Sequence, residues 1–98
     1  MSKGLVLTRK AGQGIEFTDS LSGEKHGMTV LRVTGGTVRF HFDTAQPIEL
    51  CIGQYAPVAG VDLELTLLGI ARGQATFGFD GAKTVKILRT ELTKNDHR

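Results

Sequence analysis

The chain has 98 residues and a mass of 10.6 kDa, which is enough for one compact domain and too little for two independent ones. No apolar run approaches the ~20 residues that span a bilayer, and residues 1–9 lack the apolar core of a signal peptide. One cysteine excludes an internal disulfide, and three scattered histidines lack the ligand spacing of structural zinc. We therefore expect a single cytoplasmic domain over residues 1–98, with no membrane insertion, metal or cofactor.

Glycine-rich turns and alternating apolar residues indicate an all-β fold. The chain holds 13 glycines and two prolines, and Val38, Phe40 and Phe42 alternate with polar residues in the clearest run. No segment shows a sustained helical period, residues 19–27 have the composition of a loop, and residues 93–98 are expected to form a short tail. In chain order, we expect strands near 4–10, 14–18, 28–34, 37–43, 47–52, 61–70, 74–80 and 84–90.

Two of the expected hairpins resemble each other. Residues 29–43 align with residues 66–80 at a shift of 37 positions, with six identities in fifteen. The turn glycines Gly36 and Gly73 fall in register, which simple alternation does not require. The pattern predicts an internal duplication, although two unrelated amphipathic hairpins would share part of it.

The alignment extends beyond the hairpins. The same shift places residues 47–52 over 84–89, so each repeat would be a hairpin followed by one more strand. Only residues 53–60 separate the first repeat from the second hairpin, so the duplication lost a strand or uses one strand for both halves. We divide the domain into a first half over 1–52 and a second half over 53–92.

Charge is concentrated at the two ends of the sequence. The net charge is +2, but residues 1–10 and 83–98 together carry +6 and residues 11–82 carry −4. If the fold brings the ends together, a basic patch forms that the overall charge conceals. The alternative is two solvated termini.

The sequence offers no catalytic constellation. Ser20 and Ser22 have no nucleophile context, Cys51 sits among apolar residues, and no paired carboxylates stand out. The Gly-Gln-Gly run at 12–14 lacks the helical continuation of a phosphate-binding loop and is typical of a hairpin turn. We expect no enzymatic activity.

Three segments share the order and spacing of one known family. Leu7-Thr8-Arg9-Lys10 closes an alternating apolar strand and is followed by Gly12-Gln13. Residues 66–70 and 77–80 supply a later hairpin, and residues 85–92, Val-Lys-Ile-Leu-Arg-Thr-Glu-Leu, supply a last strand that contains an arginine. In this order the segments cover nearly the whole chain and resemble the carbon storage regulator family, small bacterial proteins that bind messenger RNA.

The resemblance implies a fold. Family members are interleaved homodimers with two equal RNA sites, each made by the first strand of one subunit beside the last strand of the other. This chain is longer, has an extra hairpin and an enlarged loop at 19–27, and holds Leu88 where the family has histidine. We expect a small mixed-sheet β-barrel or sandwich, built as a monomeric single-chain pseudo-dimer.

The resemblance also implies an RNA site on the first and last strands. Arg9 and Arg89 would offer planar donor groups to phosphates and guanine edges, and apolar neighbours would pack against unstacked bases. Residues 47–52 hold no basic residue, so the second site of the family should be lost and this edge could pair with another chain. The expected RNA-binding residues are Leu7, Thr8, Arg9, Lys10, Val85, Lys86, Ile87, Leu88 and Arg89, with Val85 and Ile87 also expected in the core.

Two functions follow. The first is a post-transcriptional regulator that binds single-stranded GGA-type loops of messenger RNA hairpins and blocks ribosome access by occupancy. The second is a protein-interaction module, a degenerate family member that acts on another regulator through a protein partner. The second function remains open because half of the cationic surface expected for the family is missing.

Overall fold

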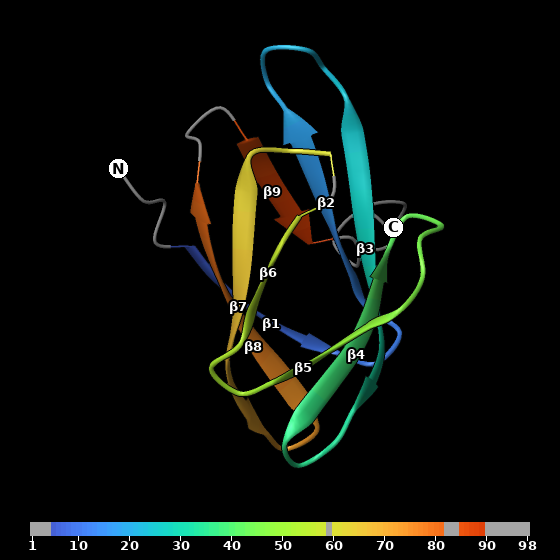
Figure 1. The fold of residues 1–98 in the computed structure, drawn as a ribbon, viewed down its shortest axis with the longest axis vertical. Coiled ribbons are helices and arrows are strands. Elements are labelled where there is room, and N and C mark those ends of the chain that lie inside the picture. Colours follow the sequence, from blue (N-terminus) through green and yellow to red (C-terminus); the bar gives the residue numbers. More distant parts are fainter. Residues whose placement is uncertain (1–4, 59, 82–84, 90–98) are drawn as a thin grey trace, which may run out of the picture.

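The computed structural model describes residues 5–58, 60–81 and 85–89, and in this part of the chain it contains nine strands and no helix (Figure 1). Eight strands lie close to those expected from the sequence, which confirms the all-β fold. The additional strand, Tyr55–Pro57, is too short to show alternation, and its proline is unfavourable for strands. The strands are β1 (Leu5–Lys10), β2 (Gly14–Asp19), β3 (Lys25–Val33), β4 (Thr37–Phe42), β5 (Ile48–Cys51), β6 (Tyr55–Pro57), β7 (Leu63–Ala71), β8 (Gln74–Gly81) and β9 (Val85–Arg89).

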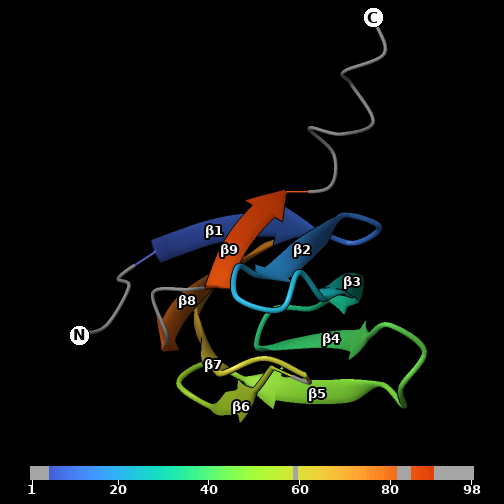
Figure 2. The same cartoon turned by 90° about the horizontal axis from the view of Figure 1, so that it is seen from above.

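The strands form two sheets that lie face to face (Figure 2). A four-stranded sheet has the order β1-β8-β7-β6, and a five-stranded sheet has the order β5-β4-β3-β2-β9. Every described pairing is antiparallel, so the expectation of mixed sheets is wrong. Short turns reverse the chain between most neighbouring strands, and the two terminal strands also run against the strands they pair with.

The inner faces of the two sheets share one hydrophobic core. Phe17 of β2 meets Phe79 of β8, and Phe40 of β4 meets Phe77 of β8, with ring centroids 5.8 and 6.0 Å apart. Both pairs have the edge-to-face geometry that aromatic rings prefer, and all four rings are buried. Burial of one phenylalanine contributes about 1.5–3 kcal/mol, so each of these four rings stabilises the packing of the two sheets.

The two terminal strands cross between the halves of the chain. β1 pairs with β8, with Leu5 opposite Phe79, whereas β9 pairs with β2, with Arg89 opposite Ile15. The first strand therefore completes the sheet of the later hairpin, and β9 completes the sheet of the earlier one.

A β-bulge recurs at the repeat spacing. The β3–β4 ladder shifts register at Leu31, and the β7–β8 ladder shifts register at Leu68, 37 positions later. Both bulged side chains lie on the outside, 42% and 50% exposed. A bulge needs one extra residue at a defined position, so its recurrence favours the duplication over two unrelated hairpins.

The turns after β1 and β5 are built from the same hydrogen bonds. In the first turn, Gln13 Oε1 accepts from Lys10 N–H at 2.8 Å, and Gln13 N–H donates to the Lys10 carbonyl at 3.1 Å. In the second turn, Gln54 Oε1 accepts from Cys51 N–H at 2.8 Å, and Gln54 N–H donates to the Cys51 carbonyl at 3.0 Å. The unit β5-turn-β6 therefore repeats the unit β1-turn-β2, at a shift of 41 positions.

Two glycines extend this equivalence. Gly12 and Gly53 precede the two glutamines with φ of 90° and 93°, in the left-handed region that favours glycine. Each donates its N–H to a carbonyl of the following long strand, β3 or β7, at 2.7 Å. The structure thus differs from the alignment of residues 47–52 with 84–89. β5 takes the place of β1 in this repeated arrangement, so a division between two repeated units would fall in the β4–β5 loop.

Candidate nucleic-acid interface

The expected site residues of β1 lie on two different faces. Thr8 and Lys10 are exposed, whereas Leu7 packs against the core and Arg9 is buried. Successive side chains of a strand point to opposite sides of the sheet, which separates the two pairs. Thr8 and Lys10 are therefore the predicted β1 residues that a ligand can reach.

Arg9 is part of the interior. Its side chain is only 3% exposed, Nε donates to the Thr8 carbonyl at 2.7 Å, and Nη1 donates to the Gly14 carbonyl at 3.4 Å. These bonds connect the end of β1 with the start of β2. The expectation of a solvent-facing Arg9 is wrong, because alternation places it on the same face as Leu5 and Leu7.

β9 shows the same separation. Val85 is buried and Ile87 packs against the core, which confirms their expected place in the core. Val85 is only 1% exposed, so its expected contact with RNA is wrong. Lys86 lies between them in the sequence and is exposed. The side chains of Leu88 and Arg89 lie outside the described part of the structure, as do residues 82–84 and 90–98.

β1 and β9 belong to different sheets, and each forms an edge. β1 pairs with β8 and β9 pairs with β2, so the expected first and last strands are not joined by a described backbone ladder. Both strands nevertheless lie on one side of the molecule, opposite β5 and β6 (Figure 2). The edge strand β1 carries the exposed Lys10, and the edge strand β9 carries the exposed Lys86. We call the side of the molecule formed by β1 and β9 the basic side.

The edge strand β5 lacks this charge. β5 lies against β4 in the same register in which β1 lies against β8, so Glu49 and Cys51 take the places of Thr8 and Lys10. Both Glu49 and Cys51 are exposed. The β5 edge thus has an uncharged thiol in place of the Lys10 ammonium group and a carboxylate, which repels phosphate, in place of the Thr8 hydroxyl, so the two edges differ in their suitability for an anion.

Two arginines outside the expected site also face solvent. Arg32 of β3 lies directly opposite Arg39 of β4, and Glu49 lies opposite Arg39 on the other side. The two arginines lie side by side on neighbouring strands and form a second concentration of cationic charge. Like charges opposite each other destabilise a sheet slightly. Sequence reasoning passed over it because both residues lie in the acidic middle of the chain.

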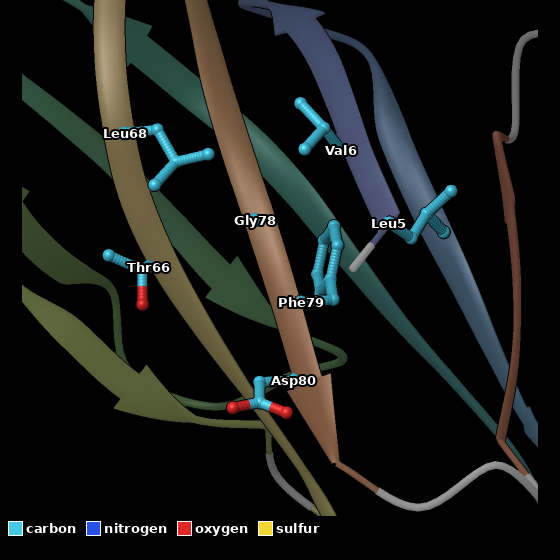
Figure 3. A pocket seen from close by; sticks show the side chains of 7 residues that line it. All are labelled: Leu5, Val6, Thr66, Leu68, Gly78, Phe79 and Asp80. Carbon is cyan, nitrogen blue, oxygen red and sulfur yellow. The ribbon is translucent and has the colours of Figure 1, made fainter. Parts of the chain in front are cut away.

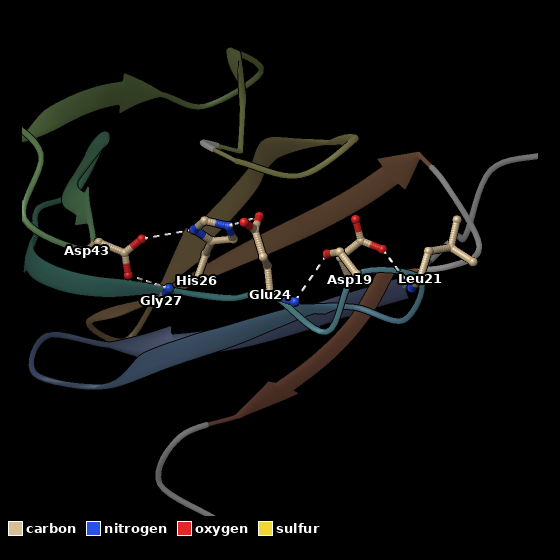
Figure 4. Close-up of polar contacts among 7 residues, drawn as sticks. Asp19, Leu21, Glu24, His26, Gly27 and Asp43 are labelled. Atoms are coloured by element: carbon tan, nitrogen blue, oxygen red, sulfur yellow. Dashed lines mark hydrogen bonds and ion pairs between the residues drawn. The ribbon is translucent and has the colours of Figure 1, made fainter.

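A polar cluster connects the loops after β2 and β4 (Figure 4). His26 Nδ1 lies 3.3 Å from Asp43 Oδ2, and His26 Nε2 lies 3.5 Å from Glu24 Oε1. Asp43 Oδ1 accepts from Gly27 N–H at 2.8 Å, and Asp43 itself has a positive φ of 44°. The cluster stabilises a loop conformation that is costly for aspartate. Within the described residues, no group of three His, Cys, Asp or Glu side chains is placed to hold a metal ion.

Comparisons with protein-family models, curated proteins and solved structures find no match for this chain. In the described residues, no helix is long and apolar enough to cross a membrane. The assignment of a function therefore depends on the sequence resemblance and on the surface just described.

Proposed function

We propose that the protein is a post-transcriptional regulator that binds single-stranded GGA-type loops of messenger RNA at its basic side. Binding would block ribosome access by occupancy, in the cytoplasm and without catalysis. The observation that carries the proposal is the contrast between equivalent edges: β1 exposes Thr8 and Lys10 where β5 exposes Glu49 and Cys51. A duplicated scaffold that keeps cationic charge at one edge is suited to one RNA site.

The strand order supports a single-chain pseudo-dimer of the carbon storage regulator type. In such a dimer the terminal strands of one subunit complete the other subunit. Here β1 pairs with β8 of the second half and β9 pairs with β2 of the first half. A pseudo-dimer needs the same first strand and turn at the beginning of each half, and the equivalent turns at Gln13 and Gln54 are consistent with this.

Affinity and stoichiometry test the proposal. Fluorescence anisotropy would compare a labelled RNA hairpin that carries GGA in its loop with one whose loop is scrambled. We expect tight binding of the GGA hairpin only, and a titration far above the Kd should break at one RNA per chain. Equal binding of the two hairpins, or a break at two RNAs per chain, would contradict the proposal.

Matched variants locate the site. We expect Lys10→Ala to weaken binding and to make the salt dependence less steep by about 0.7 per lost phosphate contact, whereas Cys51→Ala at the equivalent position should change neither. Arg89→Ala should weaken binding on the order of ten- to a hundredfold, as loss of a charge-assisted hydrogen bond of about 1.5–3 kcal/mol predicts. Arg39→Ala is the control for the pair formed by Arg32 and Arg39. If Arg39→Ala loses as much RNA affinity as Arg89→Ala, the RNA site lies at the Arg32–Arg39 pair instead.

The burial of Arg9 gives the second function a specific basis. One of the two arginines that the resemblance assigns to RNA is committed to the interior, so the basic side has fewer donors than expected. A degenerate member with weak RNA affinity would act through a protein partner. Absence of any GGA-dependent binding, in a chain that is folded by circular dichroism, would favour this protein-interaction module.

A further inference from the structure

The outer face of the four-stranded sheet carries an apolar hollow between β1, β8 and β7 (Figure 3). Its volume is about 260 Å³, and Figure 3 shows Gly78 between the side chains of Val6 and Leu68, with Thr66 and Asp80 at its border. Val6 and Leu68 are each 50% exposed. Small-molecule sites usually measure roughly 300–1,000 Å³, so this hollow is suited to a single inserted side chain.

Gly78 is the residue that leaves the hollow open. It lies opposite Val6 on one side and opposite Thr66 on the other. At the equivalent position of the five-stranded sheet, 37 residues earlier, stands His41, a partly buried residue with a large side chain. A Cβ on Gly78 would lie 2.9 Å from Leu68 Cδ1, so a side chain at this position would fill the hollow or displace Leu68.

Acidic groups border the hollow at one end. Asp80 also lines a second hollow of about 370 Å³, together with Asp62 and Glu64, and all three carboxylates are exposed. No lysine or arginine of the described residues lines either hollow, and no described ion pair neutralises these carboxylates. Such a border repels phosphate groups and attracts a cationic side chain, which favours a polypeptide over a nucleic acid.

We propose that this outer face binds an extended segment of a protein partner through two side chains. An apolar side chain such as leucine enters the hollow above Gly78, and a lysine or arginine two positions later meets the carboxylates of Asp80 and Glu64. Gly78 and Asp80 lie two residues apart on one strand, about 7 Å, which is the spacing of alternate side chains in an extended peptide. The surface uses neither Lys10 nor Lys86, so it goes beyond the proposed RNA function.

A pair of peptides tests the proposal. The probe is the acetylated peptide Gly-Leu-Ser-Lys-Gly, and the control is Gly-Leu-Ser-Glu-Gly, each titrated into the full-length ¹⁵N-labelled chain. We expect the probe to shift the amide signals of Val6, Leu68, Gly78 and Asp80 with a Kd on the order of 1 mM, and added salt to weaken it. The control peptide should shift these signals at least tenfold more weakly at equal concentration.

Variants decide whether the shifts report this surface. Leu68→Ser and Asp80→Asn should each abolish saturable binding of the probe peptide. The control variants are Leu31→Ser, at the repeat equivalent of Leu68, and Glu49→Gln, and both should bind the probe as the wild type does. Leu68→Ser should keep its affinity for the GGA hairpin, so failure of this proposal and failure of the RNA proposal are distinguishable. The proposal is overturned if the probe causes no saturable shifts at this face, or if the GGA hairpin and not the probe shifts these four signals.

Discussion

Pro57 stands in β6 where the repeat places Glu16 in β2. Val58 N–H donates to the Leu63 carbonyl, so the backbone groups of Val58 point toward β7. Backbone groups of successive residues in an edge strand point in opposite directions, so those of Pro57 point to the open edge of the sheet. Glu16 at the equivalent position lies opposite Leu88 of β9. Proline has no N–H to donate, so β6 cannot offer a further strand the bond that its counterpart is placed to offer.

The first prediction is that Pro57 keeps the chain monomeric. Edge strands with free N–H groups pair with other chains, and proline is one of the devices that prevent this pairing. We expect the wild-type protein to sediment at the monomer mass of 10.6 kDa and Pro57→Val to show a mass that rises with concentration. Pro47→Val is the control because Pro47 lies outside the strands. If Pro57→Val stays monomeric, another feature than Pro57 prevents pairing at the edge of β6.

The second prediction concerns the stability contributed by Arg9. Arg9→Ala removes the hydrogen bonds that a buried arginine donates to the carbonyls of Thr8 and Gly14, so we expect the free energy of unfolding to fall by about 1.5–3 kcal/mol. Urea denaturation followed by circular dichroism measures this change. Lys10→Ala on the exposed face should stay within about 0.5 kcal/mol of wild type. An Arg9→Ala protein of unchanged stability with reduced RNA affinity would restore Arg9 to the binding site.

The third prediction uses the two equivalent turns. Gln13→Ala and Gln54→Ala each remove one hydrogen bond of 2.8 Å to a strand-end N–H, so each should lower the free energy of unfolding by about 0.5–1.5 kcal/mol. The double variant should lose the sum, because the turns share no partner. A loss at one turn only would show that the two turns, although alike in geometry, differ in strength.

The fourth prediction separates backbone strain from steric conflict. A Cβ on Gly60 would lie 2.5 Å from His26 Cε1, whereas a Cβ on Gly23 would meet nothing within 4 Å. Both glycines have positive φ, 87° and 79°, so alanine is strained at both positions. We expect Gly23→Ala to cost about 1–2 kcal/mol and Gly60→Ala to cost more. In a His26→Ala background the cost of Gly60→Ala should fall to that of Gly23→Ala, and an unchanged cost would exclude the imidazole as its cause.

Alternation in the sequence was sufficient to predict most strands but not their neighbours. Apolar residues at every second position mark buried faces, and the pattern also places Arg9 on the face of Leu7, although the family resemblance suggested an exposed arginine. The Gly-Gln pairs at 12–13 and 53–54 were visible as a second repeat spacing. That these pairs mark equivalent turns is evident only from their hydrogen bonds, because few other residues of β1 and β5 match in sequence.

The surfaces were less predictable than the strands. The apolar hollow is lined by seven residues from β1, β7 and β8, and these three strands meet only through the sheet register. Pairing of β1 with β8 and of β9 with β2 is likewise a property of the complete fold. No local pattern in a sequence specifies partners so far apart.

The crossing of the terminal strands has a consequence for how the chain folds. Leu5 finds Phe79, and Ile15 finds Arg89, each across 74 positions of sequence, whereas the β3–β4 and β7–β8 hairpins need only local closure. Folds dominated by distant pairings fold in milliseconds to seconds, slower than those with local contacts. During synthesis the hairpins can form as they emerge from the ribosome, while β1 waits for β8 and the outer edge of β2 stays unpaired until β9 has been made.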